Sequence, residues 1–397
     1  MSLKSAAQAL SRHLFGDGSN DQNYSRDLDD FDQNSNASSF EIADFFRFNP
    51  ISNVSAFPDL NANGPTPSNS GSGDMGQLAL LDDDGNLSPV HSNSGGGSST
   101  HQLTSSRIGG TPAPTLVGPP GGLQFNLIWD SSVSSAPAGF ESAAISAALL
   151  YTGDYSNPEV INVHIGYGEV DGYSLGAGAL GESMSYGYLE NYSQVTSALN
   201  GDASSSGWQF TADASLPTSD PTNGGTFFVS TAQAKALGQV SGTGTGIDGY
   251  VGLSRIYPFD YSPITAPGFN QYDAIGTFAH ELSEVMGRVG SLGSLFGTNV
   301  YTPLDLFRYS SPGTRDLTAG PGYFSVDNGT TDLGTYNNPQ NGGDAADWIP
   351  TLVGDSYGSG YAGVRAMVSP TDIIENSVLG YKMTSSALTY TATANIA

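Results

Sequence analysis

The feature that most limits how this 397-residue chain can fold is a sharp change in composition near residue 120. Before that point Ser, Asn, Asp, Gly and Pro dominate, in stretches such as PTPSNSGSGD and GGTPAPTLVGPPGG. Such stretches bury too little apolar surface to offset the entropy lost on ordering, so we expect residues 1–120 to be largely disordered, with a pro-segment as one role. The core-forming residues come later. They predict a folded domain over residues 121–382 and a short tail over residues 383–397.

Within the folded part, strand and helix patterns alternate. Alternating or β-branched apolar runs predict strands, and apolar residues at helical spacing predict helices. The expected elements are a strand at 123–130, a helix at 137–153, a strand at 160–170, strands with a helix between them across 226–257, a helix at 273–286 and a closing helix at 369–383. This order predicts an α+β fold with a twisted mixed sheet, helices packed on it and a loop-rich C-terminal subdomain.

One predicted helix carries the clearest chemical signal. Its apolar residues run from Asp273 to Met286, with Asp273 suited to the first turn and Gly287 to the end. At about 3.6 residues per turn, His280 and Glu284 project from the same face, one turn apart. An imidazole nitrogen and a carboxylate oxygen can both bind zinc, so the spacing predicts two ligands of one cation.

A catalytic zinc site needs three protein ligands and an open position for water, whose pKa the metal lowers. Glu281, next to the first ligand, is placed to take the proton of that water as general base. Another interpretation pairs Glu284 with Arg288 one turn later and leaves His280 as a partly buried histidine. The apolar character of the helix favours the metal, because buried carboxylates are costly without a partner.

These residues also resemble a known family. The stretch AHELSEVMGRVG, with TPLDLFRYSSPGTR after it and FNLIWDSSV, INVHIGYGEV and STAQAKALG before it, resembles secreted bacterial zincin-type, metzincin-like zinc metalloproteases with an HExxExxGR motif. The resemblance spans roughly residues 120–382. It implies a zincin-like domain, one zinc ion, a polypeptide substrate, and a strand at the edge of the cleft that pairs with extended substrate. Where metzincins carry HExxHxxGxxH, this chain has Glu284 and Gly290 at the second and third ligand places.

The motif therefore leaves the third ligand unassigned. The resemblance points to Asp305, downstream of the helix, and His164 on a predicted strand is the other candidate. Tyr309, one turn after Asp305, is a candidate donor to the oxyanion formed during peptide attack. Met367 invites comparison with the methionine beneath metzincin metal sites, although core filling is its ordinary role. Because a His, Glu, Asp set is hard, manganese or iron could compete with zinc.

Charge and composition exclude several classes of function. The formal charge of −26, from 38 acidic and 12 basic residues, argues against nucleic acid and anionic membranes as partners. No apolar run is long enough to span a membrane. The chain has no cysteine, so thiolate zinc sites and disulfides are excluded. For calcium, Asp59–Gly64 and Asp82–Asn86 only partly match a binding loop, since the first lacks a glutamate at position twelve.

The sequence predicts two alternative functions. The first is a secreted, metal-dependent endopeptidase, exported without an evident N-terminal signal peptide. Its ligands are His280, Glu284 and Asp305, and Glu281 and Tyr309 act in catalysis. The alternative is a non-catalytic extracellular binding or matrix protein on a zincin scaffold. The residues leave substrate preference and oligomeric state open.

Overall fold

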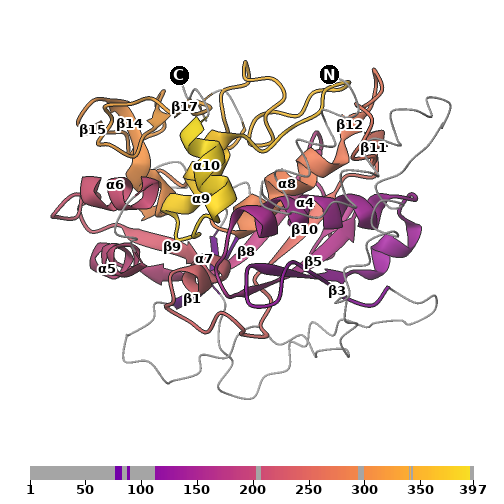
Figure 1. Ribbon diagram of the computed structural model, residues 1–397, viewed down its shortest axis with the longest axis horizontal. Helices are drawn as coiled ribbons and strands as arrows, with labels where there is room; N and C mark the ends of the chain where they lie inside the picture. The colour runs from indigo at the N-terminus through magenta and orange to yellow at the C-terminus, as the bar shows by residue number, and fades with distance from the viewer. Residues whose placement is uncertain are drawn as a thin grey trace, which may run out of the picture.

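The fold is that of a computed structural model, which describes residues 77–82, 87–89, 112–202, 207–293, 299–338, 340 and 343–393. Its main part is a mixed sheet that contains nine of the described strands. Helices α4 (Phe140–Asp154) and α8 (Ala274–Val285) pack against each other and against this sheet (Figure 1). The predicted α+β class and mixed sheet are confirmed.

The sheet has a parallel centre and antiparallel flanks. Strands β4, β5 and β10 are parallel neighbours, and β8 runs antiparallel to β10. The nine strands are β1 (Gln77–Asp82), β2 (Leu87–Pro89), β3 (Thr115–Val117), β4 (Gln124–Trp129), β5 (Val160–Tyr167), β8 (Gly181–Glu190), β9 (Thr226–Ser230), β10 (Gly249–Leu253) and β13 (Val300–Tyr301). Strands β4 and β5 match the strands predicted on either side of the first long helix.

Helix α8 is fixed in place by both apolar packing and hydrogen bonds. Phe140 of α4 makes an edge-on contact with Phe278 of α8, with ring centroids 5.2 Å apart. The buried hydroxyls of Tyr151 and Tyr381 donate to backbone carbonyls of α8 and its C-cap, at 2.6 and 2.9 Å. Buried hydrogen bonds of this kind are costly to break, so the helix is held rigidly over the sheet.

The ends of α8 lie where the sequence predicts. Asp273 caps the N-terminus, where its side chain accepts a hydrogen bond from the amide of Ile275 at 3.2 Å. At the other end Gly287 has a φ of 110°, and the amide of Arg288 donates to the carbonyl of Ser283 at 3.0 Å. This is a Schellman motif, which reverses the chain and turns Arg288 back towards the helix.

The remaining elements surround this central unit. The helices are η1 (Ser131–Ser135), α5 (Tyr192–Asp202), α6 (Trp208–Ser215), α7 (Thr231–Ala236), η2 (Leu304–Phe307), α9 (Pro370–Val378) and α10 (Ser385–Thr393). A second sheet has the order β15 (Thr314–Arg315), β14 (Arg308–Ser311), β16 (Tyr323–Phe324) and β17 (Gly334–Thr335). Two short pairs are β6 (Glu169–Val170) with β7 (Tyr173–Ser174), and β11 (Phe259–Asp260) with β12 (Tyr272–Asp273).

Both ends of the chain contain regular secondary structure beyond what the sequence predicts. Within residues 1–120, the described segments include β1 and β3, and both belong to the main sheet. The closing helix is present as α9, with Ser369 as N-cap and a φ of 114° at Gly380 beyond its end. Residues 385–393 of the predicted tail form α10, which packs against α9 and α4. None of the described helices is long and apolar enough to cross a membrane.

Candidate metal centre

His280 and Glu284 lie on one face of α8, as their spacing predicts. The Nε2 atom of His280 is 3.3 Å from Oε1 of Glu284. A third residue, Asp347, brings Oδ1 to 3.3 Å from the same Nε2 atom. Among the described residues, these three form the one group of His, Asp and Glu whose ligand atoms all lie within 4.8 Å of one another.

Asp347 reaches the helix from the loop between β17 and α9. The next residue, Trp348, is buried and stacks on Tyr336 with ring centroids 5.0 Å apart. Its indole nitrogen donates to Asp372, the third residue of α9, at 2.7 Å. The burial of Trp348 thus anchors the loop and delivers Asp347 to His280.

A backbone contact fixes the orientation of His280. Its Nδ1 atom is 2.8 Å from the carbonyl oxygen of Ser356, and an oxygen of this kind only accepts hydrogen bonds. Nδ1 therefore carries a proton, and Nε2 faces the two carboxylates. The amide of Ser356 in turn donates to the carbonyl of Met367 at 3.0 Å. Such a support on the far ring nitrogen is typical of histidines that bind metals.

The two distances from Nε2 of His280 to the carboxylate oxygens match those between ligands of a small divalent cation. A charge-assisted hydrogen bond between imidazolium and carboxylate is usually about 2.7–2.9 Å. The two contacts of Nε2 are longer, at 3.3 Å. Ligands at about 2.0–2.1 Å from a tetrahedral zinc ion lie about 3.3–3.4 Å from one another. The donor set of one imidazole and two carboxylates suits zinc, manganese or iron.

Arg288 also contacts both carboxylates. It is fully buried, and its guanidinium lies 3.2 Å from Oε1 of Glu284 and 3.1 Å from Oδ1 of Asp347. It lies over the ring of Tyr357, 4.4 Å from the centroid. The pairing of Glu284 with Arg288 is therefore present together with the His280 contact. With His280 neutral and both carboxyl groups ionised, the three ligands carry a charge of −2, which Arg288 reduces to −1 for the four residues together.

The electrostatics of the cluster favour a positive charge at Nε2. Burial alone lowers the pKa of His280, but the charges of Asp347 and Glu284 outweigh it and raise that pKa. Burial raises the pKa of Glu284, yet the contact with His280 and the charge of Arg288 lower it overall. For Asp347 burial prevails, and the pKa is raised. Either a proton on Nε2 of His280 or a bound metal cation can supply this positive charge.

The first residues of β8 shape the other side of the helix. Ser183 donates a hydrogen bond to Oε2 of Glu284 at 2.8 Å. Two residues earlier, a Cβ atom at Gly181 would lie 2.5 Å from Oε1 of Glu281. A side chain at residue 181 would therefore push the carboxylate of Glu281 aside, and Glu281 is only 5% exposed. Gly181, Ser183 and Asp347 contribute to the site, although no motif in the sequence marks them.

Asp305, which the family resemblance favours as third ligand, does not join the cluster. Its Oδ2 atom accepts hydrogen bonds from the amides of Ser291, Leu292 and Thr302, at 3.2, 3.0 and 2.8 Å. Burial outweighs these bonds and raises the pKa of Asp305 to about 6. Asp305 thus shapes the loop after α8, and Asp347 takes the third place in the cluster.

The other candidates also lie elsewhere. Tyr309 is buried in the second sheet, where its hydroxyl is 3.5 Å from Oγ of Ser215. His164 lies on β5, with Nδ1 2.6 Å from Asp130. Met367 is 60% exposed and does not lie beneath the cluster as a buried support. The calcium candidates at 59–64 and 82–86 lie outside the described residues, except for Asp82 at the end of β1.

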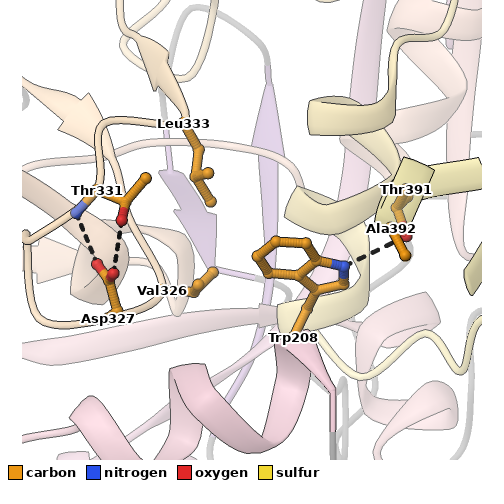
Figure 2. Close-up of a pocket in the computed structure, with 7 residues that line it drawn as sticks. All are labelled: Trp208, Val326, Asp327, Thr331, Leu333, Thr391 and Ala392. Carbon is orange, nitrogen blue, oxygen red and sulfur yellow. Dashed lines mark hydrogen bonds between the residues drawn. The ribbon is translucent and has the colours of Figure 1, made fainter. Parts of the chain in front are cut away.

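A surface pocket near the C-terminus does not include the cluster. Figure 2 shows Trp208 facing Val326 and Leu333, with its indole nitrogen 3.3 Å from Oγ1 of Thr391. Asp327 in its wall already accepts two hydrogen bonds from Thr331. The polar groups drawn there are bonded to one another, so the pocket offers no comparable set of ligand atoms.

No family model, curated protein or solved structure matches this chain. Its function is therefore inferred from the residues of the site.

Proposed function

We propose that this protein is a metal-dependent endopeptidase of zincin type that acts outside the cell. His280, Glu284 and Asp347 hold one divalent cation, for which zinc is the first candidate. The observation that carries the proposal is the convergence of their three ligand atoms within 4.8 Å, on an oriented histidine. The antiparallel strand β8, which contacts Glu281 and Glu284, fits the strand that the zincin resemblance implies at the edge of the cleft.

A bound divalent cation supplies Lewis acidity and makes a water molecule acidic near neutral pH. Glu281 accepts the proton of the attacking water, whose oxygen joins the peptide carbonyl carbon. When the C–N bond breaks, Glu281 returns the proton to the departing amine, so water is consumed and two peptides leave. Ser183 and Arg288 orient Glu284, and the carbonyl of Ser356 keeps Nε2 of His280 directed at the carboxylates.

The second candidate function is a non-catalytic binding protein. One observation favours it: Arg288 contacts the same two carboxylate oxygens that face His280. If His280 is protonated, two cations and two carboxylates form a neutral cluster that needs no metal. Buried networks of this kind occur as structural features.

A pair of matched variants distinguishes the two functions. We expect Asp347→Asn to weaken zinc binding at least about tenfold, because it removes a charged ligand, and to reduce casein hydrolysis accordingly. Asp305→Asn is the control: it affects a buried aspartate near the same helix and should leave zinc stoichiometry near one. Elemental analysis after dialysis measures both. Equal zinc content in the two variants, or none in the unmodified protein, would favour the binding protein.

A further inference from the structure

Two segments that follow α8 in the sequence meet at the candidate metal centre. One carries Asp347, and the other carries Ser356, whose carbonyl oxygen is 2.8 Å from Nδ1 of His280. The amide of Trp348 donates to the carbonyl of Tyr357 at 2.8 Å, so the backbones of the two segments are joined. The geometry of the cluster therefore depends on what holds these segments to the rest of the fold.

Asp372, in the first turn of α9, contacts both segments. Its Oδ1 atom accepts a hydrogen bond from the indole nitrogen of Trp348 at 2.7 Å. Its Oδ2 atom accepts one from the amide of Ser369 at 2.8 Å and lies 3.5 Å from Oγ of Ser356. The side chain is fully buried. One carboxyl group thus links α9 to both segments at once.

A second buried carboxyl group, that of Asp355, meets Asp372. Asp355 precedes Ser356, and its Oδ1 atom accepts a hydrogen bond from the amide of Tyr357 at 2.8 Å. Its carboxyl group also forms a hydrogen bond with that of Asp372. An ionised carboxylate is only an acceptor, so a hydrogen bond between two carboxyl groups requires one proton. Since both oxygens of Asp372 accept bonds from other groups, the donor is Asp355.

The charges around the pair favour this proton. Burial and the charge of Asp355 raise the pKa of Asp372 well above its usual range, and burial raises the pKa of Asp355. Arg288 lowers the pKa of Asp355, but its guanidinium already contacts Glu284 and Asp347. Two carboxyl groups in such a position titrate as a unit and share one proton. Burial also raises the pKa of other titratable groups that face the pair, which are Glu375 of α9, Tyr390 of α10, Tyr151 and Tyr155 of α4, and Tyr357.

We propose that Asp355 and Asp372 are positioning residues of the candidate metal centre: they share one proton and so hold the segment that carries Asp347 beside the segment that orients His280. Both act through their neighbours and not by binding the cation. The consequence for zinc rests on the proposed metal-dependent function. The shared proton and the orientation of His280 are properties of the metal-free protein, so they can be tested without zinc or turnover.

Two variants at residue 355 separate the hydrogen bond from the mere presence of a side chain. Asp355→Asn keeps the bond, because its amide nitrogen can donate to Asp372 while its carbonyl oxygen accepts from Tyr357. Asp355→Ala removes the bond. Asp305→Ala is the matched control, since it also removes a buried carboxyl group that accepts backbone hydrogen bonds, but outside the cluster.

The orientation of His280 is measured on the metal-free protein by NMR of histidine-labelled samples, with His280→Gln to assign the signal. We expect the proton on Nδ1 of His280 to exchange with solvent at least about tenfold faster in Asp355→Ala, because the carbonyl of Ser356 is no longer held in place. Asp355→Asn and Asp305→Ala should exchange like the unmodified protein. Zinc affinity, from competition with a chromophoric chelator, should follow the same order, with at least about a tenfold loss in Asp355→Ala.

The shared proton is measured by urea unfolding of the metal-free protein. The unfolded chain releases it above about pH 4, whereas the folded pair retains it, so its contribution to stability falls as the pH rises. Asp355→Asn has no such proton to retain. Between about pH 5 and 7 we expect the unfolding constant of the unmodified protein, divided by that of Asp355→Asn, to rise about tenfold per pH unit. Other buried carboxyl groups are common to both proteins and cancel in this ratio.

The outcomes separate the positioning role from the function. Exchange of the Nδ1 proton at the same rate in Asp355→Asn and Asp355→Ala overturns the proposal, and so does a ratio of unfolding constants that does not change with pH. If the unmodified protein binds no zinc while both metal-free measurements give the expected results, the proposal stands and the metal-dependent function alone is refuted.

Discussion

Glu284 shows at the residue scale how the site is balanced. Its Oε2 atom accepts a hydrogen bond from Ser183, while Oε1 faces both His280 and Arg288. A carboxylate held from three sides has little freedom to rotate, so its position is set before any ligand arrives. That preorganisation lowers the cost of binding a cation. Arg288 contributes to it while reducing the negative charge that attracts the cation.

Glu281 is expected to act in chemistry and not in metal binding. Glu281→Gln keeps the size of the side chain but removes the base, so casein hydrolysis should fall by about 10²- to 10⁴-fold. Zinc content, measured on the same sample, should stay near one equivalent. Undiminished hydrolysis would remove Glu281 from the mechanism, whereas loss of zinc would place it among the ligands.

Arg288→Met should show how much the positive charge of Arg288 stabilises the two buried carboxylates of the cluster. It leaves two buried carboxylates without a guanidinium, so we expect the metal-free protein to lose about 3–5 kcal/mol of unfolding free energy. Zinc should restore more stability to this variant than to the unmodified protein, because the cation replaces the lost charge. Urea unfolding with and without zinc measures this effect.

A matched control uses a different ion pair. Lys382, which is 2.6 Å from Asp202 and half exposed, can be changed to Met. The expected loss is at most about 1 kcal/mol and is independent of zinc. If zinc stabilises Arg288→Met and the unmodified protein equally, the guanidinium does not share the charge of the cluster with a metal.

At the scale of elements, the end of α8 determines where Arg288 lies. The Schellman motif needs a residue with positive φ, which Gly287 supplies at 110°. A Cβ atom there would also lie 3.0 Å from the Gln233 side chain. The motif turns the next residue, Arg288, back along the helix, where its Nε atom donates to Ser283 at 2.7 Å. A backbone feature thus positions a charged group of the site.

Gly287→Ala should therefore affect both the stability of the protein and the candidate metal centre. We expect a loss of about 1–2 kcal/mol from the left-handed backbone, with weaker zinc binding as Arg288 and Glu284 shift. Gly201→Ala in α5 is the control, because a Cβ atom there meets nothing within 4 Å. That change should be neutral or stabilising by up to about 1 kcal/mol. Normal zinc affinity in Gly287→Ala would show that the motif does not position the cluster.

At the scale of the whole molecule, an acidic chain has folded with several carboxylates buried. Asp213 in α6 is one of them, and neither of its oxygens has a hydrogen-bond partner among the described residues. Burial, reinforced by the charge of Asp202, raises its pKa to about 7. The folded protein therefore holds a proton between about pH 4 and 7 that the unfolded chain releases. This contribution to stability falls as the pH rises through that range.

Asp213→Asn removes this pH dependence. We expect a gain of up to about 4 kcal/mol at pH 8 and of less than about 2 kcal/mol at pH 5, both reduced by solvent screening. Thermal unfolding at the two pH values checks the difference, and the exposed Glu141→Gln serves as control. The same gain at pH 5 and pH 8 would contradict a raised pKa for Asp213.

The sequence by itself determined the local features of this protein. Helical spacing placed His280 and Glu284 on one face, and capping chemistry placed the ends of α8 at Asp273 and Gly287. These features depend on residues within one or two turns of each other, so they are readable along the chain. The α+β class followed from the alternation of strands and helices.

Only the tertiary structure decided which carboxylate completes the cluster. Asp305 and Asp347 are both aspartates after the helix, but one caps a loop and the other meets His280. That choice depends on where the burial of Trp348 places a distant loop, and local spacing carries no information about it. The same holds for β1, whose pairing with β8 joins segments about a hundred residues apart. Long-range contacts form because apolar surface is buried and backbone groups are paired, which are properties of the whole fold.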